Sequence, residues 1–161
     1  MTQRPSTARP ASAGLLLYRR RGARTEVLLV HPGGPLWRNR WDGWWQIPKG
    51  EIDNGEDPLS GARREFEEEL GVAVASDGHS LGEVRQAGGK LVIAFACEGD
   101  LDPADIVSNM FELEWPPRSG RVARFPEIDA ARWFGLDEAE TAMLPSQRPF
   151  LARLQALLPS G

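Results

Sequence analysis

The pattern of hydrophobic and polar positions along this chain predicts a mixture of strands and helices. Segment 111–115 alternates apolar and acidic residues, which is the period of a strand. Segments 136–143 and 148–158 instead have helical spacing. Further short runs predict strands at 13–18, 26–31, 44–48, 72–75, 81–86, 89–97 and 131–134, with a basic turn at 19–25 and a loop at 32–43.

One predicted helix has well-marked ends. Asp57 suits the N-cap, Pro58 suits the first turn, and Gly71 suits the left-handed position after the last turn. Four apolar positions form a stripe on this helix that predicts its buried face: Leu59, Ala62, Phe66 and Leu70.

The same helix carries a cluster of acids. Glu65, Glu68 and Glu69 stand at i, i+3 and i+4, so they fall on one face, about a quarter turn from the stripe. Like charges at this spacing repel by about a few tenths of a kcal/mol per exposed pair. A charge-rich helix face is often merely solvated. Because the cluster has no other evident counter-charge, we instead expect a divalent cation, and such carboxylates suit Mg²⁺ or Mn²⁺.

Residues around the helix favour the same interpretation. Arg64 lies beside the cluster and can orient a glutamate through a bidentate pair. Gly50 and Gly55 allow the preceding loop to turn tightly and bring Glu56 back toward the helix.

Composition is that of an ordinary globular protein. The chain has 161 residues, 41% apolar and 26% charged, which fits one domain. Residues 1–11 are rich in Pro, Ser, Thr and Arg and are expected to form a mobile tail before a domain at 12–161. No run is long enough to cross a membrane, and no secretory signal is apparent, so a cytoplasmic location is expected. Cys97, the single cysteine, is expected in the core.

The net charge of −4 limits the classes of molecule that the protein is expected to bind. With 23 acids against 19 bases, we expect no stable nucleic-acid binding. An acidic protein would repel a polyphosphate substrate unless bound divalent cations lie between the acids and the phosphates.

The helix and its loop together match a spaced signature. It consists of Gly, five residues, Glu, seven residues, Arg-Glu, an apolar residue, any residue, Glu-Glu, any residue, Gly and an apolar residue. A chance match at a given start is on the order of one in a billion. This pattern resembles the signature of the Nudix hydrolases, and its fixed positions are Gly50, Glu56, Arg64, Glu65, Phe66, Glu68, Glu69, Gly71 and Val72.

The resemblance implies a fold, a reaction and a metal site. The fold is an α/β/α sandwich with a mixed sheet between helices. The reaction is metal-dependent hydrolysis of a phosphoanhydride bond in a nucleoside diphosphate derivative, with Mg²⁺ as cofactor and Mn²⁺ as its alternative. Glu56 resembles a supporting acid and Arg64 its structural partner. The implied metal ligands are Glu65, Glu68, Glu69 and the backbone of Gly50.

Members of this superfamily often place a further carboxylate outside the helix. We favour Glu127 as this group, binding a metal or taking the proton from the attacking water. It precedes Arg132-Trp133, and this spacing resembles a segment of diadenosine tetraphosphate hydrolases. Glu112 and Glu114 are the alternatives, since their strand face carries only acids.

Candidate substrate contacts come from two residue types. Lys49 and Lys90, the only lysines, flank predicted strand ends and are expected to contact phosphates. Four tryptophans lie within nine residues, and an aromatic face can stack a nucleobase. Core positions are expected for Trp44 and Trp45, which leaves Trp41, or Trp37, to stack the base.

The sequence is compatible with several classes of substrate. Segments 14–20, 48–50, 90–93 and 132–139 resemble diadenosine tetraphosphate hydrolases. However, the tyrosine expected after the signature is missing, and Gln86 stands near the proline of the ADP-ribose branch. Dinucleoside polyphosphates and nucleoside triphosphates are the favoured substrates, and diphosphoinositol phosphates are a third open class. The alternatives to an enzyme are a catalytically silent nucleotide-binding module and an acidic interaction domain, and the oligomeric state is undetermined.

Overall fold

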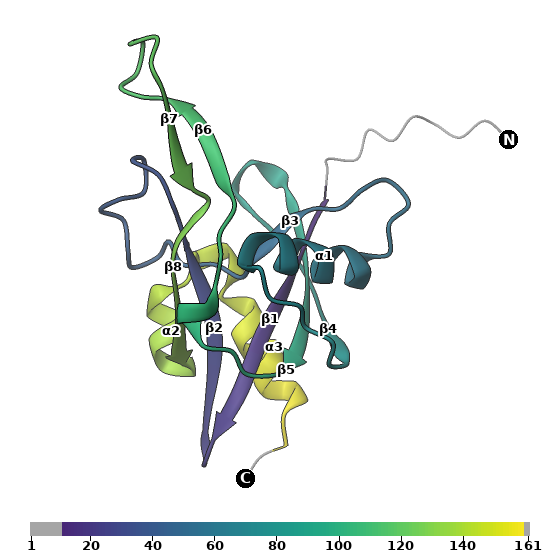
Figure 1. The fold of residues 1–161 in the computed structure, drawn as a ribbon. Helices are drawn as coiled ribbons and strands as arrows, with labels where there is room; N and C mark the ends of the chain where they lie inside the picture. The colour runs from purple at the N-terminus through teal and green to yellow at the C-terminus, as the bar shows by residue number, and fades with distance from the viewer. Residues whose placement is uncertain (1–10, 160–161) are drawn as a thin grey trace, which may run out of the picture.

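The computed structural model describes residues 11–159, and a mixed six-stranded sheet forms the centre of this part of the chain (Figure 1). The strand order is β4-β5-β1-β2-β8, and β3 pairs with β1 at one end. β1 and β5 are parallel, whereas the other neighbours are antiparallel. The strands are β1 Ala11–Arg21, β2 Arg24–Pro32, β3 Lys49–Glu51, β4 Gly78–Arg85, β5 Leu91–Glu98 and β8 Ile128–Gly135.

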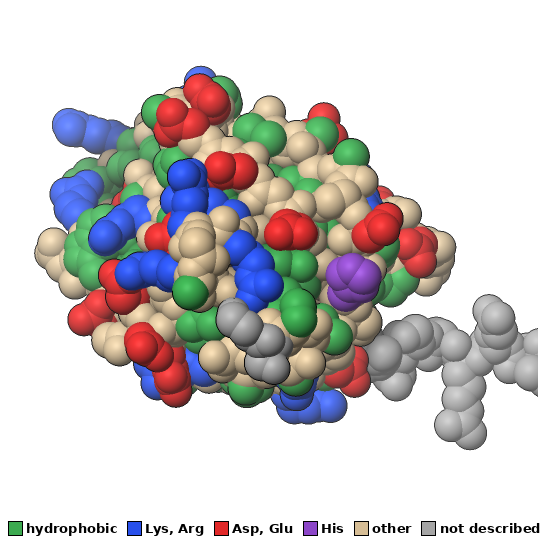
Figure 2. All heavy atoms as spheres, turned by 90° about the horizontal axis from the view of Figure 1, so that it is seen from below, with side chains coloured by type: hydrophobic (Ala, Val, Ile, Leu, Met, Phe, Trp, Pro, Cys, Tyr) green, Lys and Arg blue, Asp and Glu red, His purple; other side chains and the backbone are tan. Residues whose placement is uncertain are grey.

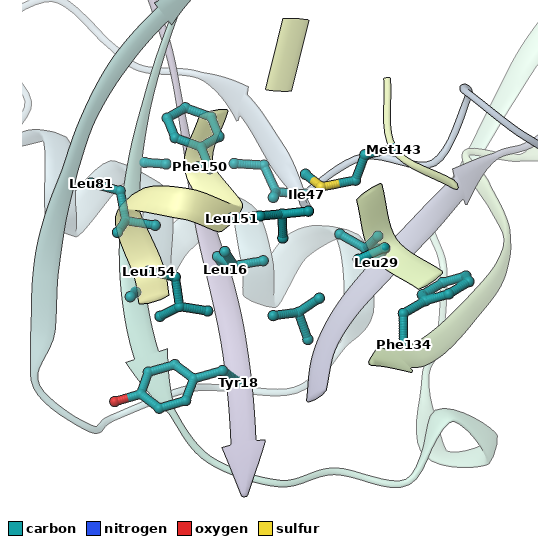
Figure 3. Packing of buried hydrophobic residues seen from close by; sticks show 14 of the residues in the cluster. Leu16, Tyr18, Leu29, Ile47, Leu81, Phe134, Met143, Phe150, Leu151 and Leu154 are labelled. Carbon is teal, nitrogen blue, oxygen red and sulfur yellow. The ribbon is translucent and has the colours of Figure 1, made fainter. Parts of the chain in front are cut away.

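Helices cover both faces of the sheet, which confirms the α/β/α sandwich. α1 (Pro58–Leu70) packs on one face, and α2 (Leu136–Ala142) and α3 (Pro149–Leu157) pack on the other. Each interface has its own apolar core. Figure 3 shows the core beneath α2 and α3, where Phe150, Leu154 and Met143 meet side chains of the sheet.

The ends of α1 form as predicted. The Asp57 carboxylate accepts a hydrogen bond from the backbone N–H of Ser60 (3.1 Å), which satisfies a donor of the first turn. Gly71 ends the helix at a φ of 73°, a conformation that costs glycine little. Ala62, Phe66 and Leu70 are fully buried, so the predicted stripe anchors the helix in the core.

Two predicted strands are wrong. Residues 44–48 make only isolated bridges, between Val30 and Gln46 and between Trp45 and Met143. The reason is that Ile47 donates its backbone N–H to the Gln147 side chain (3.0 Å) instead of to a strand. Residues 72–75 also form no strand.

Smaller corrections concern boundaries. β1 ends later and β2 begins earlier in the sequence than predicted, so the turn expected at 19–25 is reduced to Gly22 and Ala23. Ala11, assigned to the tail, is the first residue of β1, and residues 1–10 lie outside the described part of the chain. Cys97 is buried as predicted. No helix within residues 11–159 is long and apolar enough to cross a membrane.

A second, two-stranded sheet was only half predicted. β6 (Met110–Glu114) matches the alternating segment, but its partner β7 (Val122–Pro126) was missed. β7 is short and carries no strong β-branched run, so its strand conformation depends on pairing with β6.

Candidate functional site

β3, which contains the first residue of the signature, lies against α1. Gly50 pairs with Ala13 in the sheet, and its backbone lies directly against the Glu65 carboxylate. A methyl group at residue 50 would overlap this carboxylate, so only glycine allows the close approach. Burial raises the pKa of Glu65, and its hydrogen bond with Arg64 opposes this rise.

Arg64 connects three acids of the signature. Its Nε and Nη2 donate to the two oxygens of Glu56 (2.9 Å each), a bidentate pair that holds the pKa of Glu56 down at about 2. Its Nη1 donates to Glu65 Oε1 (2.9 Å) and to Glu68 Oε2 (3.1 Å). The predicted pairing of Arg64 with a glutamate is therefore present, and it extends to two of the cluster acids.

This network corrects the expectation that the acids lack a counter-charge. Arg64 forms ion pairs with Glu65 and Glu68, while Glu69 interacts with Lys49. Across residues 11–159, no three acid, histidine or cysteine side chains lie close enough to hold a metal ion as they stand. Glu68 pairs with Arg64 in an i,i+4 ion pair and shares the Nη1 group of Arg64 with Glu65.

Glu69 and Glu127 meet at a small cavity of about 140 Å³. Burial raises the pKa of Glu69 to about 8, and the charges of Glu65 and Glu127 add to the rise. Burial likewise lowers the pKa of Lys49, and the charge of Lys90 lowers it further. The cavity is lined by Val30, Pro32, Gln46, Ile47, Lys49, Glu69, Glu127 and Ile128.

The backbone on both sides holds Glu127 at this cavity. Its N–H donates to the carbonyl of Asn109 (2.8 Å), and its own carbonyl accepts from the N–H of Gly33 (2.8 Å). The structure therefore brings Glu127 to the helix acids. Glu112 and Glu114 lie out on β6, where Glu114 caps the backbone N–H of Arg118 (2.9 Å).

The donor set suits a hard divalent cation. Two partly buried carboxylates, Glu65 and Glu69, have raised pKa values, so a cation would relieve an existing electrostatic cost. The bare backbone of Gly50 lets the Glu65 carboxylate approach β3 closely, so backbone and carboxylate oxygens lie near each other. A shift of Arg64 toward Glu56 alone would free Glu68 to complete the set.

The other residues predicted to contact the substrate lie in different parts of the molecule. Lys90 approaches Glu51 (Nζ to Oε1, 3.6 Å) and is close enough to Lys49 to affect its pKa. Trp45 is buried as expected, but Trp44 is only half-buried. Trp41 is 45% exposed and packs beside Trp45, which belongs to the core on the α2/α3 face, so it does not join the α1 glutamates.

One buried polar group was not singled out from the sequence. His31 is fully buried, its Nδ1 lies 2.8 Å from Asp129, and its Nε2 contacts the carbonyl of Arg40. Its ring also stacks on Trp41, with centroids 4.0 Å apart. A lone histidine at the end of a predicted strand gives no signal for such contacts, because all three partners are distant in sequence or lie in a loop.

The close approach of Gly50 to Glu65 gives a direct test. We expect Gly50→Ala to displace the Glu65 carboxylate and lower turnover by about 10- to 100-fold, the usual cost of disturbing the support of a metal ligand. Steady-state kinetics would measure this loss. Gly55→Ala is the matched control for general loop strain, since Gly55 has a positive φ but no side chain near its Cα. Equal losses in both variants would show that loop strain, and not the contact with Glu65, is responsible.

Comparison with known proteins agrees with this geometry. The sequence profile described as NUDIX domain matches residues 8–154. An RNA pyrophosphohydrolase of Rhodospirillum rubrum is 31% identical over 98% of this chain and 94% of that protein. A second RNA pyrophosphohydrolase, from Rhizobium meliloti, is also 31% identical, over 76% of this chain and 83% of that protein.

Solved structures share the fold. A binary complex of a C. elegans Ap4A hydrolase has a TM-score of 0.64 at 20% identity, covering 90% of this chain and 96% of that chain. The NUDIX domain of Shewanella oneidensis NrtR, complexed with ADP ribose, has a TM-score of 0.65 at 16% identity, covering 96% of this chain and 91% of that chain. The profile match, the relatives and the intact signature lead to one conclusion: this chain belongs to the Nudix family.

Proposed function

We propose that this protein hydrolyses a phosphoanhydride bond in a nucleoside diphosphate derivative, with Mg²⁺ or Mn²⁺ as cofactor. The observation that carries the proposal is the convergence of Glu69, Glu127 and Lys49 on one cavity beside the Gly50–Glu65 contact. Two carboxylates and a desolvated lysine at one cavity are the groups that water activation and phosphate binding require.

Each residue has a distinct role in this proposal. A bound divalent cation would polarise the phosphoryl oxygens and lower the pKa of the attacking water. Glu65, Glu68 and Glu69 would hold it, supported by Gly50 and by the Arg64–Glu56 pair. Glu127 would take a proton from the attacking water as the water oxygen bonds to phosphorus and the bridging P–O bond breaks. Lys49, with Lys90 near it, would bind phosphate oxygens.

Several substrates are compatible with this chemistry. The sequence segments similar to diadenosine tetraphosphate hydrolases favour a dinucleoside polyphosphate or a nucleoside triphosphate. The 31% identity to proteins named RNA pyrophosphohydrolase adds a further candidate substrate, RNA that carries a pyrophosphate linkage. In each case the scissile group is the same, so the site chemistry does not choose between them.

Removal of the cation is the simplest test. In a product screen that resolves nucleotides, pyrophosphate and phosphate, run over dinucleoside polyphosphates, nucleoside triphosphates and 5′-triphosphorylated RNA, we expect turnover with Mg²⁺ or Mn²⁺ and none in excess EDTA. Activity should return when Mg²⁺ is added beyond the chelator, which controls for irreversible damage. Full turnover of any substrate in EDTA would contradict the proposed metal dependence. Nucleotide binding without product release under every condition would instead favour the silent module.

A further inference from the structure

One polar side chain at the cavity beside Glu127 has no role in the proposed function. Four of the residues that line this cavity are apolar, and the other four are Gln46, Lys49, Glu69 and Glu127. In the proposed function Lys49 binds phosphate, Glu69 holds the cation and Glu127 takes a proton. Gln46 is therefore the polar group whose contribution is unexplained.

The surrounding backbone directs the Gln46 side chain into the cavity. Gln46 and Val30 exchange two backbone hydrogen bonds (2.9 Å each), and Val30 belongs to the core on the α1 face of the sheet. Directly paired residues point to the same side of a sheet. The flanking Trp45 and Ile47 are both buried in the core on the opposite face. Because side chains alternate along extended backbone, Gln46 faces the side of α1, where the cavity lies.

The amide of Gln46 is available to a molecule in the cavity. Within residues 11–159, neither its Oε1 nor its Nε2 has a hydrogen-bond partner, although the side chain is half-buried. Gln147 differs, because its Oε1 accepts the backbone N–H of Ile47 (3.0 Å) and so has a structural role. The Gln46 amide offers one acceptor and one donor group that the fold itself does not use.

The attacking water needs more than one fixed hydrogen bond. In the proposed step the water oxygen bonds to phosphorus, one proton passes to Glu127, and the electron pair of the broken P–O bond stays on the leaving oxygen. A single hydrogen bond to Glu127 lets the water rotate about that bond, so its lone pair would not stay directed at phosphorus. A second acceptor, for the O–H group that is not transferred, removes this freedom.

We infer that Gln46 orients the attacking water, with its Oε1 accepting the O–H group that is not transferred to Glu127. The ammonium group of Lys49 has no acceptor, and Glu69 is a proposed ligand of the cation. A neutral amide also adds no negative charge that would repel the phosphates, and a glutamine performs this orienting role in GTPases. This inference rests on the proposed function and adds one residue to its catalytic site.

Gln46→Ala removes the second acceptor. We expect the single-turnover rate with Mg²⁺ to fall by about 10- to 100-fold, while the dissociation constant of the substrate changes less than about twofold. The pairing with Val30 uses only backbone atoms, so the unfolding temperature should stay close to that of the wild type. ATP and GTP are the probes, or diadenosine and diguanosine tetraphosphate if the wild type hydrolyses those faster. Both members of the pair should lose the same factor.

Gln46→Glu separates accepting from donating. A carboxylate keeps the shape and the acceptor oxygens of the side chain but has no N–H group. If Gln46 accepts from water, this variant should recover most of the rate lost in Gln46→Ala, while its added charge weakens substrate binding. A rate as low as that of Gln46→Ala would instead show that the amide acts as a donor.

A double-mutant cycle tests whether Gln46 and Glu127 hold the same water. In a Glu127→Gln background, Gln46→Ala should cost less than about threefold in rate, because the water has already lost its base. If the two losses multiply in full, the side chains act independently, and the inference fails.

Gln155→Ala is the matched control, since it makes the same change at the far end of the molecule. Gln155 is an exposed residue of α3 and lines a groove with Arg20 and Arg24 of the β1–β2 hairpin. Figure 2 shows this end from below, where basic and acidic side chains are interspersed. The control variant should match the wild type in rate and in substrate binding.

The outcomes separate this inference from the proposed function. If the wild type hydrolyses no substrate with Mg²⁺ or Mn²⁺, the proposed function fails and the inference fails with it. If the wild type is active and Gln46→Ala is equally fast, only the inference is overturned. A loss confined to one base of the pair would also overturn it, because Gln46 would then contact the base and not the water.

Discussion

Glu69→Gln is expected to lower turnover by about 100-fold or more while the protein stays folded. Glu69 lies at the cavity with Lys49 and Glu127, and its carboxylate is one of the oxygen donors available to a cation. Glutamine keeps the shape of the side chain but removes its charge. Steady-state kinetics with Mg²⁺ and thermal unfolding without it would measure the two effects separately.

The raised pKa of Glu69 predicts how stability depends on pH without metal. Its pKa lies near 8 in the folded protein against an ordinary value of 4.5, because burial and the charges of Glu65 and Glu127 disfavour ionisation. Between these values the folded state holds the proton more tightly than the unfolded state, so this contribution to stability is lost as pH rises from about 4.5 to about 8. Glu69→Gln should flatten the profile in this window, and the variant should be the more stable protein at pH 8. Mg²⁺ should raise the unfolding temperature of the wild type at pH 8 but much less that of the variant.

Glu67→Gln is the matched control on the same helix. Glu67 is exposed and lies outside the acid cluster, so its replacement should change neither turnover nor the pH profile of stability. If Glu69→Gln unfolds the protein, or retains wild-type turnover, the carboxylate is structural or dispensable. If Glu67→Gln reproduces the loss, the effect comes from the total charge of α1.

Glu127→Gln is expected to lower kcat by about 10²–10⁴, the usual cost of losing a positioned general base, with little change in substrate affinity. The carboxylate stands at the cavity because hydrogen bonds to Asn109 and from Gly33 hold the backbone on either side. It is close enough to raise the pKa of both Glu65 and Glu69, so its charge acts on the same site. Pre-steady-state kinetics, which separate chemistry from binding and release, would locate the loss.

The two acids of β6 are internal controls for Glu127. Glu112→Gln and Glu114→Gln should be milder, because neither side chain lines the cavity. Normal turnover in Glu127→Gln together with a large loss in either control would assign the role of general base to β6. The metal-ligand proposal for α1 would be unaffected by that outcome.

Local sequence signals were sufficient for the elements that form by local interactions. Asp57, Pro58 and Gly71 fixed the ends of α1, because capping and the left-handed turn depend on residues within a few positions. The spacing of Glu65 and Glu69 placed them on one side of the helix for the same reason. The prediction of Trp44 to Pro48 as a strand failed because a distant side chain, Gln147, takes one of its backbone hydrogen bonds.

The sequence by itself thus determined the fold, the family signature and the helix that carries the acids, since each is a pattern within one segment or a sum of short segments. Only the tertiary structure decided what surrounds those acids. It assigned Arg64 as their counter-charge, buried Glu69 enough to raise its pKa to about 8, and brought Lys49 and Glu127 to one cavity. It also joined Asn109 and Gly33 to the backbone of Glu127. These features depend on desolvation and on contacts between residues up to 94 positions apart (Gly33 and Glu127), and neither leaves a trace in local spacing.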